Sequence, residues 1–177
     1  MADKANMSLT FRTLFRRFTT GVAVVGVAGG DGPVGATVNS LTAVSLDPML
    51  LLFCARNGSR TAGHIQETGA FSVNILTAEQ EAVSRHYAGE PGDKPDWTWH
   101  AFDETVRLEG ANATFVCRLE RVHAAGDHAI IVGRVTDMAG PETPGTPLLY
   151  HGGGYAALPW PGEAPEPVEP VSFWWTG

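Results

Sequence analysis

Residues 22–40 decide the class of fold, and they read Val22-Ala-Val-Val-Gly-Val-Ala-Gly-Gly-Asp-Gly-Pro-Val-Gly-Ala-Thr-Val-Asn-Ser40. Two extended runs, Val22 to Ala28 and Val34 to Ser40, flank a turn cluster that covers residues 29–33. Runs rich in β-branched residues and separated by Gly, Asp and Pro are typical of two strands joined in a hairpin. We therefore expect a β-rich fold that contains this hairpin.

Extended patterns continue through the rest of the chain. We expect further strands at Met49–Ala55, Ala70–Leu76, Val106–Glu109, Ala113–Ala125, His128–Met138, Leu148–Tyr150 and Tyr155–Leu158. The run at 49–55 is apolar throughout, as in a strand buried on both faces. Gly126-Asp127 separates the two longest runs and favours a type I′ hairpin turn.

The helical patterns are fewer and shorter. An amphipathic helix is expected over about Leu9 to Thr19, and a second helix runs from an N-cap at Ser59 to Thr68, where Gly69 ends it. Thr77 with Gln80 has the spacing of a capping box, which begins a third helix that ends near Tyr87. Many strands with few helices, and no regular alternation between them, predict a mainly β fold built as an antiparallel β-barrel.

Two segments stand out from this pattern. The segment Ala88–Glu104 is rich in Gly, Pro and Asp but carries three aromatic residues, so it is either a surface loop held by aromatic burial or a lid. Residues 159–177 form a Pro-rich acidic arm that ends in Phe173-Trp174-Trp175, and residues 1–158 form the domain before it. Large aromatic residues are favoured at interfaces, so we expect the arm to dock on this chain or on a partner subunit.

Composition excludes several classes of protein. The chain has 177 residues, of which 18% are charged, and a net charge of −7 without a basic stripe, which argues against nucleic-acid binding. Neither an apolar run of about 18 residues nor a secretion signal is present, which predicts a cytoplasmic protein that does not enter a membrane. The two cysteines lie in apolar runs and the six histidines are dispersed, so we expect neither a disulfide nor a metal site.

Familiar catalytic motifs are absent from the sequence: it holds no P-loop, no nucleophile elbow and no Rossmann fingerprint. The more informative stretches are Gly35–Ser40 and Ala43–Pro48, which gather short hydroxyl and amide side chains at a strand end and in the loop after it. Such side chains can surround a planar heterocycle, although Thr and Ser also fill turns and strand edges. Spacing alone leaves both interpretations open.

Seven landmarks occur in a fixed order along the chain. They are Phe11-Arg12 with Thr20-Gly21-Val22, Gly35-Ala36-Thr37-Val38-Asn39-Ser40, Val44-Ser45-Leu46-Asp47-Pro48, Phe71-Ser72-Val73-Asn74-Ile75-Leu76, Asp93-Lys94, Gly126-Asp127-His128, and Leu148-Leu149-Tyr150 leading to Tyr155. With these landmarks the sequence resembles the flavin reductase-like domain family, which is found in the reductase components of two-component flavin-dependent monooxygenases. The resemblance implies a homodimeric split β-barrel, a Greek-key-like antiparallel barrel with a few short helices.

The resemblance also assigns residues to a flavin site. It implies that the isoalloxazine ring is lined by Thr37, Val38, Asn39, Ser40, Ser45 and Leu46, that Cys54, Ala55 and Arg56 lie beside it, and that Ser59, Arg60 and Thr61 cradle a phosphate. The start of a helix supports such a cradle, because its free N–H groups and its dipole favour an anion. Arg60 could otherwise be a solvated surface charge.

Three further positions follow from the resemblance. Family members tend to have Ser-x-Arg before an aromatic residue, whereas this chain has Ser84-Arg85-His86-Tyr87, so either Arg85 or His86 reaches the flavin phosphate. His128 looks like the family residue beside the nicotinamide, and we interpret this catalytic position as a positioning group, because hydride transfer depends on closely stacked rings. Tyr155 either lines the same pocket or is an aromatic residue at a strand edge.

The function that the resemblance implies is that of an NADH-dependent flavin reductase. Such an enzyme uses NADH to reduce FAD (or FMN) and supplies the reduced flavin to a separate monooxygenase. Two alternatives remain at this stage: an oxidase or oxygenase that keeps its flavin and acts on an organic substrate, and a non-enzymatic flavin-binding electron carrier.

Overall fold

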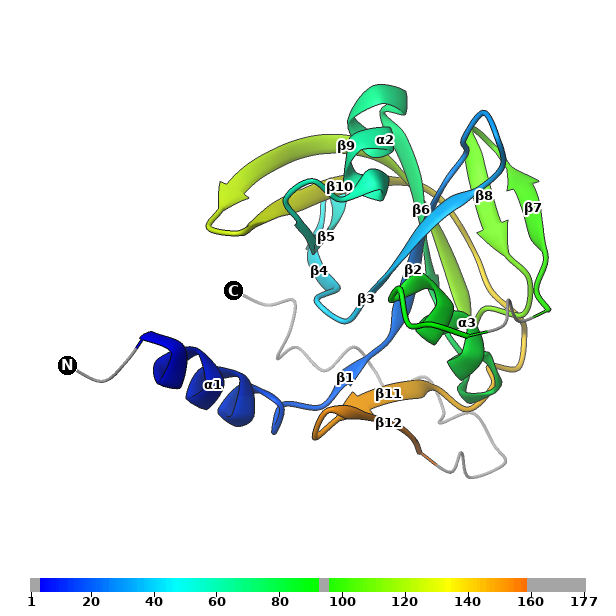
Figure 1. Cartoon of the computed structure of the whole chain (residues 1–177). Coiled ribbons are helices and arrows are strands. Elements are labelled where there is room, and N and C mark those ends of the chain that lie inside the picture. Colours follow the sequence, from blue (N-terminus) through cyan, green and yellow to red (C-terminus); the bar gives the residue numbers. More distant parts are fainter. Residues whose placement is uncertain (1–3, 93–95, 159–177) are drawn as a thin grey trace.

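The computed structural model describes residues 4–92 and 96–158 (Figure 1). The acidic arm at 159–177, with its three adjacent aromatic residues, lies outside the described residues, so its docking stays a prediction. The helices are α1 (Lys4–Phe15), α2 (Arg60–Thr68), the short 3-10 helix η1 (Ala78–Gln80) and α3 (Glu81–Tyr87). The predicted preponderance of strands over helices is confirmed.

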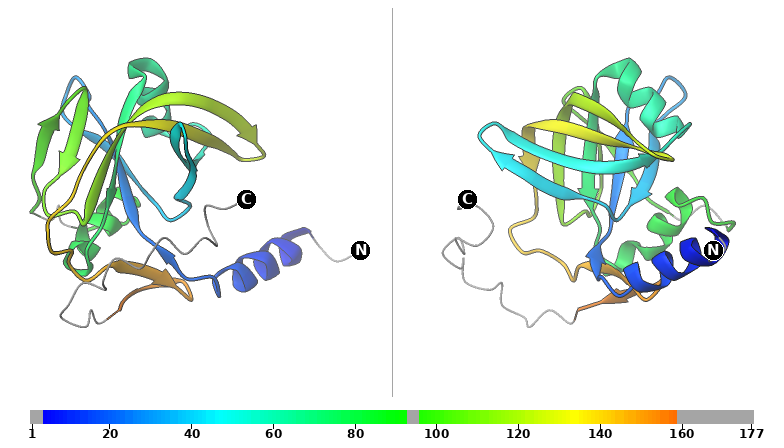
Figure 2. Two further views of the ribbon diagram at one scale, coloured as in Figure 1. Left: turned by 180° about the vertical axis from the view of Figure 1, so that it is seen from behind. Right: turned by 90° about the vertical axis from the view of Figure 1, so that its left-hand side faces the viewer.

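A seven-stranded antiparallel sheet forms the body of the domain, in the order β3-β2-β6-β9-β10-β5-β4. Its strands are β2 (Ala23–Val27), β3 (Val34–Val38), β4 (Thr42–Leu46), β5 (Met49–Arg56), β6 (Ala70–Ile75), β9 (Ala113–Ala125) and β10 (His128–Ala139). Figures 1 and 2 show that this sheet curls on itself. Its edge strands β3 and β4 are not paired with each other, so the predicted barrel is split, not closed.

Two smaller sheets flank the barrel. β1 (Thr20–Gly21), β11 (Leu148–His151) and β12 (Gly154–Ala157) make a three-stranded sheet beside α1, and β7 (Trp99–Phe102) pairs with β8 (Thr105–Leu108). The formation of β7 corrects the prediction of one loop over 88–104. Residues 99–102 of that segment form β7 and pair with β8, and Trp99 packs against Gly26 of β2, where an added Cβ would lie 2.7 Å from the indole ring.

The opening hairpin is confirmed as β2 and β3. Ala23 pairs with Val38 and Val27 with Val34, which puts every residue of β2 in the core. On one side of β2 the core contains Phe53 and Phe71, whose rings meet edge to face at 5.6 Å. Asn74 of β6 is also fully buried, and its amide oxygen accepts hydrogen bonds from the Leu108 amide and the Thr114 hydroxyl, each at 2.9 Å.

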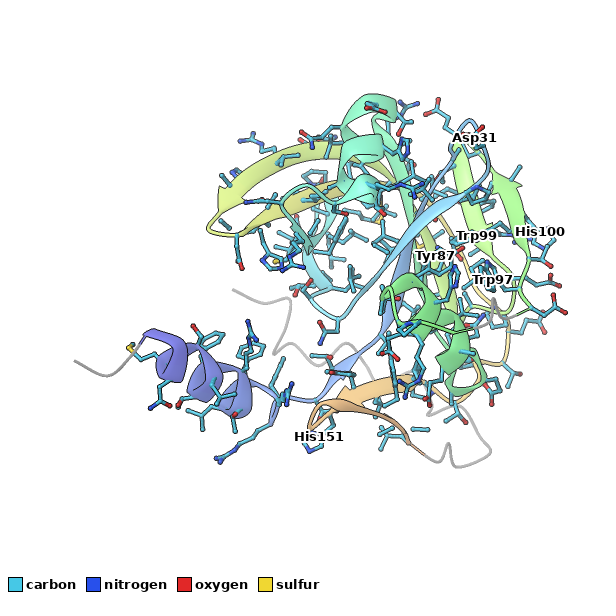
Figure 3. All side chains as sticks on the ribbon, viewed as in Figure 1. Asp31, Tyr87, Trp97, Trp99, His100 and His151 are labelled. Carbon is cyan, nitrogen blue, oxygen red and sulfur yellow. The ribbon has the colours of Figure 1, made fainter. Side chains whose placement is uncertain are left out.

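Aromatic side chains fasten the segment after α3 to the barrel. The Tyr87 hydroxyl accepts hydrogen bonds from the indole N–H groups of Trp97 (3.0 Å) and Trp99 (2.7 Å), and Figure 3 shows the three side chains gathered between α3 and β7. Burial raises the pKa of the Tyr87 hydroxyl, although the two indole donors oppose this shift. The aromatic burial expected for this segment is therefore observed at Trp97 and Trp99, while a role as a lid stays a prediction.

Three local predictions need correction. The first helix covers 4–15, not 9–19, and its apolar side chains are exposed instead of forming a buried face. Residues of β5 alternate between buried and more exposed positions, so this strand is buried on one face only. In the turn between β9 and β10, Gly126 has φ 67° while Asp127 has no positive φ, which excludes a type I′ turn.

Other expectations hold in the described residues. Ser59 caps α2, and Gly69 ends it with φ 72°. The Thr77 amide donates to the Gln80 side-chain oxygen at 3.1 Å, although the helix begins with a 3-10 turn. Cys54 and Cys117 are both free thiols. No helix in the described part of the chain is long and apolar enough to cross a membrane. Cytoplasmic location stays a prediction.

Candidate functional site

A cavity of about 320 Å³ lies where the end of β3, the strand β5 and the start of α2 meet. We name it the α2 cavity. Ten residues predicted from the sequence line it: Thr37, Val38, Asn39, Ser40, Cys54, Ala55, Arg56, Ser59, Thr61 and His128. These residues are distributed over more than 90 positions of the chain, so the fold gathers them into one site.

The start of α2 forms one wall of this cavity. Ser59 is the N-cap, and its side-chain oxygen accepts a hydrogen bond from the Ala62 amide at 3.4 Å. Thr61 is buried just behind the cap. The first N–H groups of a helix have no partners within the helix, and the helix dipole adds partial positive charge there. This wall therefore favours an anionic group such as a phosphate.

On the opposite wall of the cavity, one side chain links the segment 37–40 to β5 across the split in the barrel. The Cys54 amide of β5 donates to the Ser40 hydroxyl at 2.9 Å, just beyond the end of β3. This bond holds the 37–40 segment close to β5 although β3 and β5 are not sheet neighbours. The polar side chains of Thr37, Asn39 and Ser40 thus lie beside the cavity on a fixed backbone, as a planar polar ligand requires.

His128 closes the cavity from β10, where it pairs with Arg56 of β5. Its Nδ1 lies 2.8 Å from a carboxylate oxygen of Asp127, so Nε2 is the ring nitrogen left for a ligand. The hydrogen bond with His128, followed by its electrostatic attraction, holds the pKa of the Asp127 carboxyl below its ordinary value. The arrangement fixes the imidazole orientation and gives it a donor or acceptor at the cavity.

Asn57 is a positioning residue that the sequence analysis did not find. Its side-chain amide donates to the Gly126 carbonyl at 3.1 Å, and its backbone N–H donates to the Asp127 carbonyl at 3.0 Å. Both bonds tie the turn before His128 to the loop before α2. No motif indicated this role, because it depends on two loops that meet only in the fold.

A second cavity of about 230 Å³ adjoins the first and shares Thr37 and Asn39 with it. We name it the tyrosine cavity, since Tyr150 and Tyr155 line it, with ring centroids 5.6 Å apart. The Tyr155 hydroxyl lies 2.8 Å from the Ser84 hydroxyl. Tyr155 therefore lies near the predicted site, but in its neighbouring compartment.

Five predicted residues line neither cavity. Ser45 and Leu46 line a separate apolar groove of about 340 Å³ between β4, β5 and β10, and Arg60 is exposed at the start of α2. The Arg85 guanidinium pairs with Glu81 and Glu90, each at 2.8 Å, and His86 packs against Trp97 with ring centroids 4.7 Å apart. Their roles in flavin binding stay predictions.

A larger cavity, of about 720 Å³, lies at the base of the β7–β8 hairpin and contains none of the predicted site residues. Its polar groups pair with one another: the Gln80 amide donates to the Glu109 carbonyl at 2.8 Å, and Asn112 exchanges hydrogen bonds with Gly145. Size therefore does not locate the site here. No group of three or more potential metal ligands occurs among residues 4–92 and 96–158.

The polar cavity of this split β-barrel is bounded by the start of a helix and by short polar side chains of a kind that can surround a planar heterocycle. These features are typical of barrel proteins that bind nucleotides. Comparison with known proteins specifies the family: the flavin reductase like domain model matches residues 15–159, and the chain belongs to that family. The NADH-dependent FMN reductase SmoA of Agrobacterium fabrum is 38% identical, over 84% of each chain. The reductase component of 4-hydroxyphenylacetate 3-monooxygenase from Thermus thermophilus is 36% identical, over 88% of this chain and 99% of its own.

Solved structures agree with the sequence comparison. The NADH:FAD oxidoreductase SgcE6 of Streptomyces globisporus, in complex with NAD and FAD fragments, superposes with a TM-score of 0.81 at 31% identity. The match covers 92% of this chain and 99% of that one. The fold and family expected from the sequence are thereby confirmed.

Proposed function

We propose that this protein is an NADH-dependent flavin reductase that transfers a hydride from NADH to FAD or FMN and supplies free reduced flavin to a separate monooxygenase. The observation that carries the proposal is the α2 cavity, which brings together nine residues predicted at the flavin and His128, predicted at the nicotinamide. Membership of the flavin reductase family supports the same reaction. The relatives named as monooxygenase reductase components support the separate oxygenase as partner.

The residues of the α2 cavity fit a flavin. The start of α2, with Ser59 and Thr61, suits the phosphate, and the polar segment 37–40 suits the heteroatoms of the ring. Arg56 adds a positive charge at the rim. A bound flavin supplies the hydride acceptor, while these side chains hold its ring at a fixed place and angle.

We assign His128 to the nicotinamide side of the cavity. Asp127 orients its ring, Asn57 holds the turn that precedes it, and its Nε2 can hydrogen-bond a polar group of the dinucleotide. Hydride transfer needs close and oriented rings more than it needs a strong acid, so His128 acts by positioning.

We also propose that the protein is a homodimer. The apolar groove is lined by exposed Leu46, Met49 and Met138, and α1, which projects from the barrel, exposes Phe11 and Phe15 (Figure 2). Apolar surface of this kind usually marks an interaction site, and a second copy would cover both surfaces. The mass of the protein in solution, measured by analytical ultracentrifugation, tests this point.

Flavin-dependent oxidation of NADH by the purified protein tests the function. The reductase should turn over added FAD or FMN and should lose its flavin during purification. A protein that keeps stoichiometric flavin and oxidises NADH slowly would be the flavin-retaining oxidase or oxygenase instead. A protein that binds flavin but does not oxidise NADH would be an electron carrier.

A further inference from the structure

The C-terminal end of α1 is fastened to the turn that joins β11 to β12. The Gly152 backbone N–H donates to the Arg16 carbonyl at 2.9 Å, and the Thr19 hydroxyl lies 2.7 Å from Nδ1 of His151 (Figure 3). The Arg16 guanidinium also lies against Gly153, where an added Cβ would be 3.3 Å from it. Because β12 is the last described strand, the described chain ends within one short strand of the base of α1.

α1 and the turn after it carry two exposed arginines on one side. Arg12 and Arg16 are four residues apart, and the Arg16 backbone N–H donates to the Arg12 carbonyl at 3.0 Å, so the two side chains lie on the same face. Each follows an exposed phenylalanine, Phe11 or Phe15, by one residue, which places it about 100° further around the helix. Within residues 4–92 and 96–158, neither arginine forms an ion pair. We name this pair the arginine face of α1.

The arm at 159–177 has the opposite charge. It contains no Lys or Arg, and its acidic residues are Glu163, Glu166 and Glu169. These glutamates recur every third residue among prolines, and a Pro-rich segment favours the polyproline II helix, which has three residues per turn. The sequence therefore predicts carboxylates along one side of the arm, about 9 Å apart.

The arm is long enough to reach the arginine face. Ala157 pairs with Leu148 at the far end of β12, so the arm has to return over a length of about 13 Å to reach the base of α1. The segment from Ala157 to Glu163 spans about 19 Å at 3.1 Å per residue. Its first glutamate can thus reach Arg16, and the next one lies about 9 Å further on, more than the rise of about 6 Å to Arg12.

Other arginines of the barrel offer the arm less. Arg85, Arg118 and Arg134 are each already held by a carboxylate of the barrel. Arg56 lines the α2 cavity, where a flavin is proposed. The arginine face combines positive charge, exposure and nearness to the start of the arm.

We propose that the C-terminal arm docks along α1 of its own chain, where its glutamates pair with Arg12 and Arg16. The arginine face differs from the face of Phe11 and Phe15, so a second copy can cover the phenylalanines while the arm is bound. Exposed ion pairs are weak one by one and are screened by salt, so docking should weaken as ionic strength rises. The docking does not depend on the proposed hydride transfer, and its test does not measure activity.

Hydrogen exchange of the α1 amides, measured by mass spectrometry on the full chain, tests the docking. In the wild-type protein the exchange should be slower at low salt than at high salt. Replacement of all three arm glutamates by glutamine should raise the low-salt rate about fivefold and remove most of its salt dependence. The matched control makes the same replacement at three exposed glutamates of the barrel and should leave α1 unchanged. These are Glu67, Glu79 and Glu142.

A cross-link identifies the occupant of the arginine face. Arg12→Lys keeps the positive charge and supplies an amine that a carbodiimide can join to a neighbouring carboxylate. We expect a link between position 12 and an arm glutamate, in a product that runs at monomer mass on a denaturing gel. Arg121→Lys is the control, because Arg121 is exposed on β9 and lies outside α1, and it should give no link to the arm.

Faster exchange in the arm variant alone, together with the monomer-mass link, supports the proposal. Equal exchange in the wild-type protein and the arm variant overturns it. Protection of α1 that rises with protein concentration and ignores the arm glutamates also overturns it, because a second copy then covers the arginines. A link to the arm found only at dimer mass overturns docking within one chain and assigns the arm to the partner copy.

Discussion

The Thr37 hydroxyl donates a hydrogen bond to the Ser84 carbonyl at 2.6 Å, and this contact ties the wall that the two cavities share to α3. Thr37 lies on β3 at the shared wall, while Ser84 lies on α3 and holds the Tyr155 hydroxyl through its own side chain. Because its proton is engaged, the Thr37 hydroxyl can only accept a hydrogen bond from a flavin. The sequence predicted Thr37 as a flavin ligand but not this constraint.

Thr37→Val tests this contact, because it removes the hydroxyl and keeps the shape of the side chain. We expect a loss of about 1 kcal/mol in the free energy of unfolding, because the bond to the Ser84 carbonyl is lost. We also expect a higher Kd for flavin, because the bond that the flavin donates to Thr37 is lost. Thr37→Ser should restore both values. Chemical denaturation and flavin titration measure them, and an unchanged Kd in Thr37→Val would remove Thr37 from the flavin site.

His128→Ala should weaken the binding of NADH without weakening the binding of flavin. We expect a raised KM for NADH and a flavin Kd close to that of the wild-type protein, because the imidazole is assigned to the nicotinamide side of the α2 cavity. Steady-state kinetics and flavin titration check this pair of values. The opposite pattern, with weakened flavin and unchanged NADH binding, would contradict the assignment.

Ser59 has two roles that substitutions can separate. Ser59→Ala removes the cap of α2 and should cost about 1 kcal/mol of stability. Ser59→Asp keeps a capping oxygen but places a negative charge where a phosphate is expected, so stability should be retained while flavin affinity falls strongly. Thermal unfolding and flavin titration distinguish the two variants. Wild-type flavin affinity in Ser59→Asp would exclude a phosphate at this helix start.

The two thiols should differ in reactivity. Burial raises the pKa of the Cys117 thiol to about 12, so at pH 8 it stays protonated and inert, whereas Cys54 lines the α2 cavity. We expect alkylation of Cys54 alone in the native protein, slowed by FAD, with mass spectrometry as the measurement. Alkylation of Cys117 at pH 8 without unfolding would contradict the predicted difference in reactivity.

The raised pKa of Cys117 also affects stability. Because an unfolded thiol has a pKa of about 8.5, the free energy of unfolding should fall as pH rises above that value.

Local sequence rules predicted the elements that local chemistry determines. The hairpin β2–β3 follows from β-branched runs and a turn, and α2 follows from its Ser59 cap and Gly69 stop. The burial of β5 on one face only was not predictable from its apolar composition, because composition does not show which face of a strand other elements cover.

In the site, too, residues in local motifs were predictable and residues placed by long-range contacts were not. The resemblance identified most of the α2 cavity, but Asn57, Tyr150 and Glu90 depend on loops and strands that meet only in three dimensions. Ser45 and Leu46 line the apolar groove in this structure, so their predicted role at the flavin stays a prediction. Their side chains are placed by the pairing of β4 with β5, which no spacing in the sequence expressed.

The central claim is tested most directly by anaerobic mixing of the purified protein with excess NADH and a large excess of free FAD or FMN. The account predicts that each NADH oxidised reduces one flavin, and that one protein molecule reduces many flavins in succession. Oxidation of NADH at the same rate without added flavin, or reduction limited to one flavin per protein, would contradict the claim that this protein is a reductase for diffusible flavin.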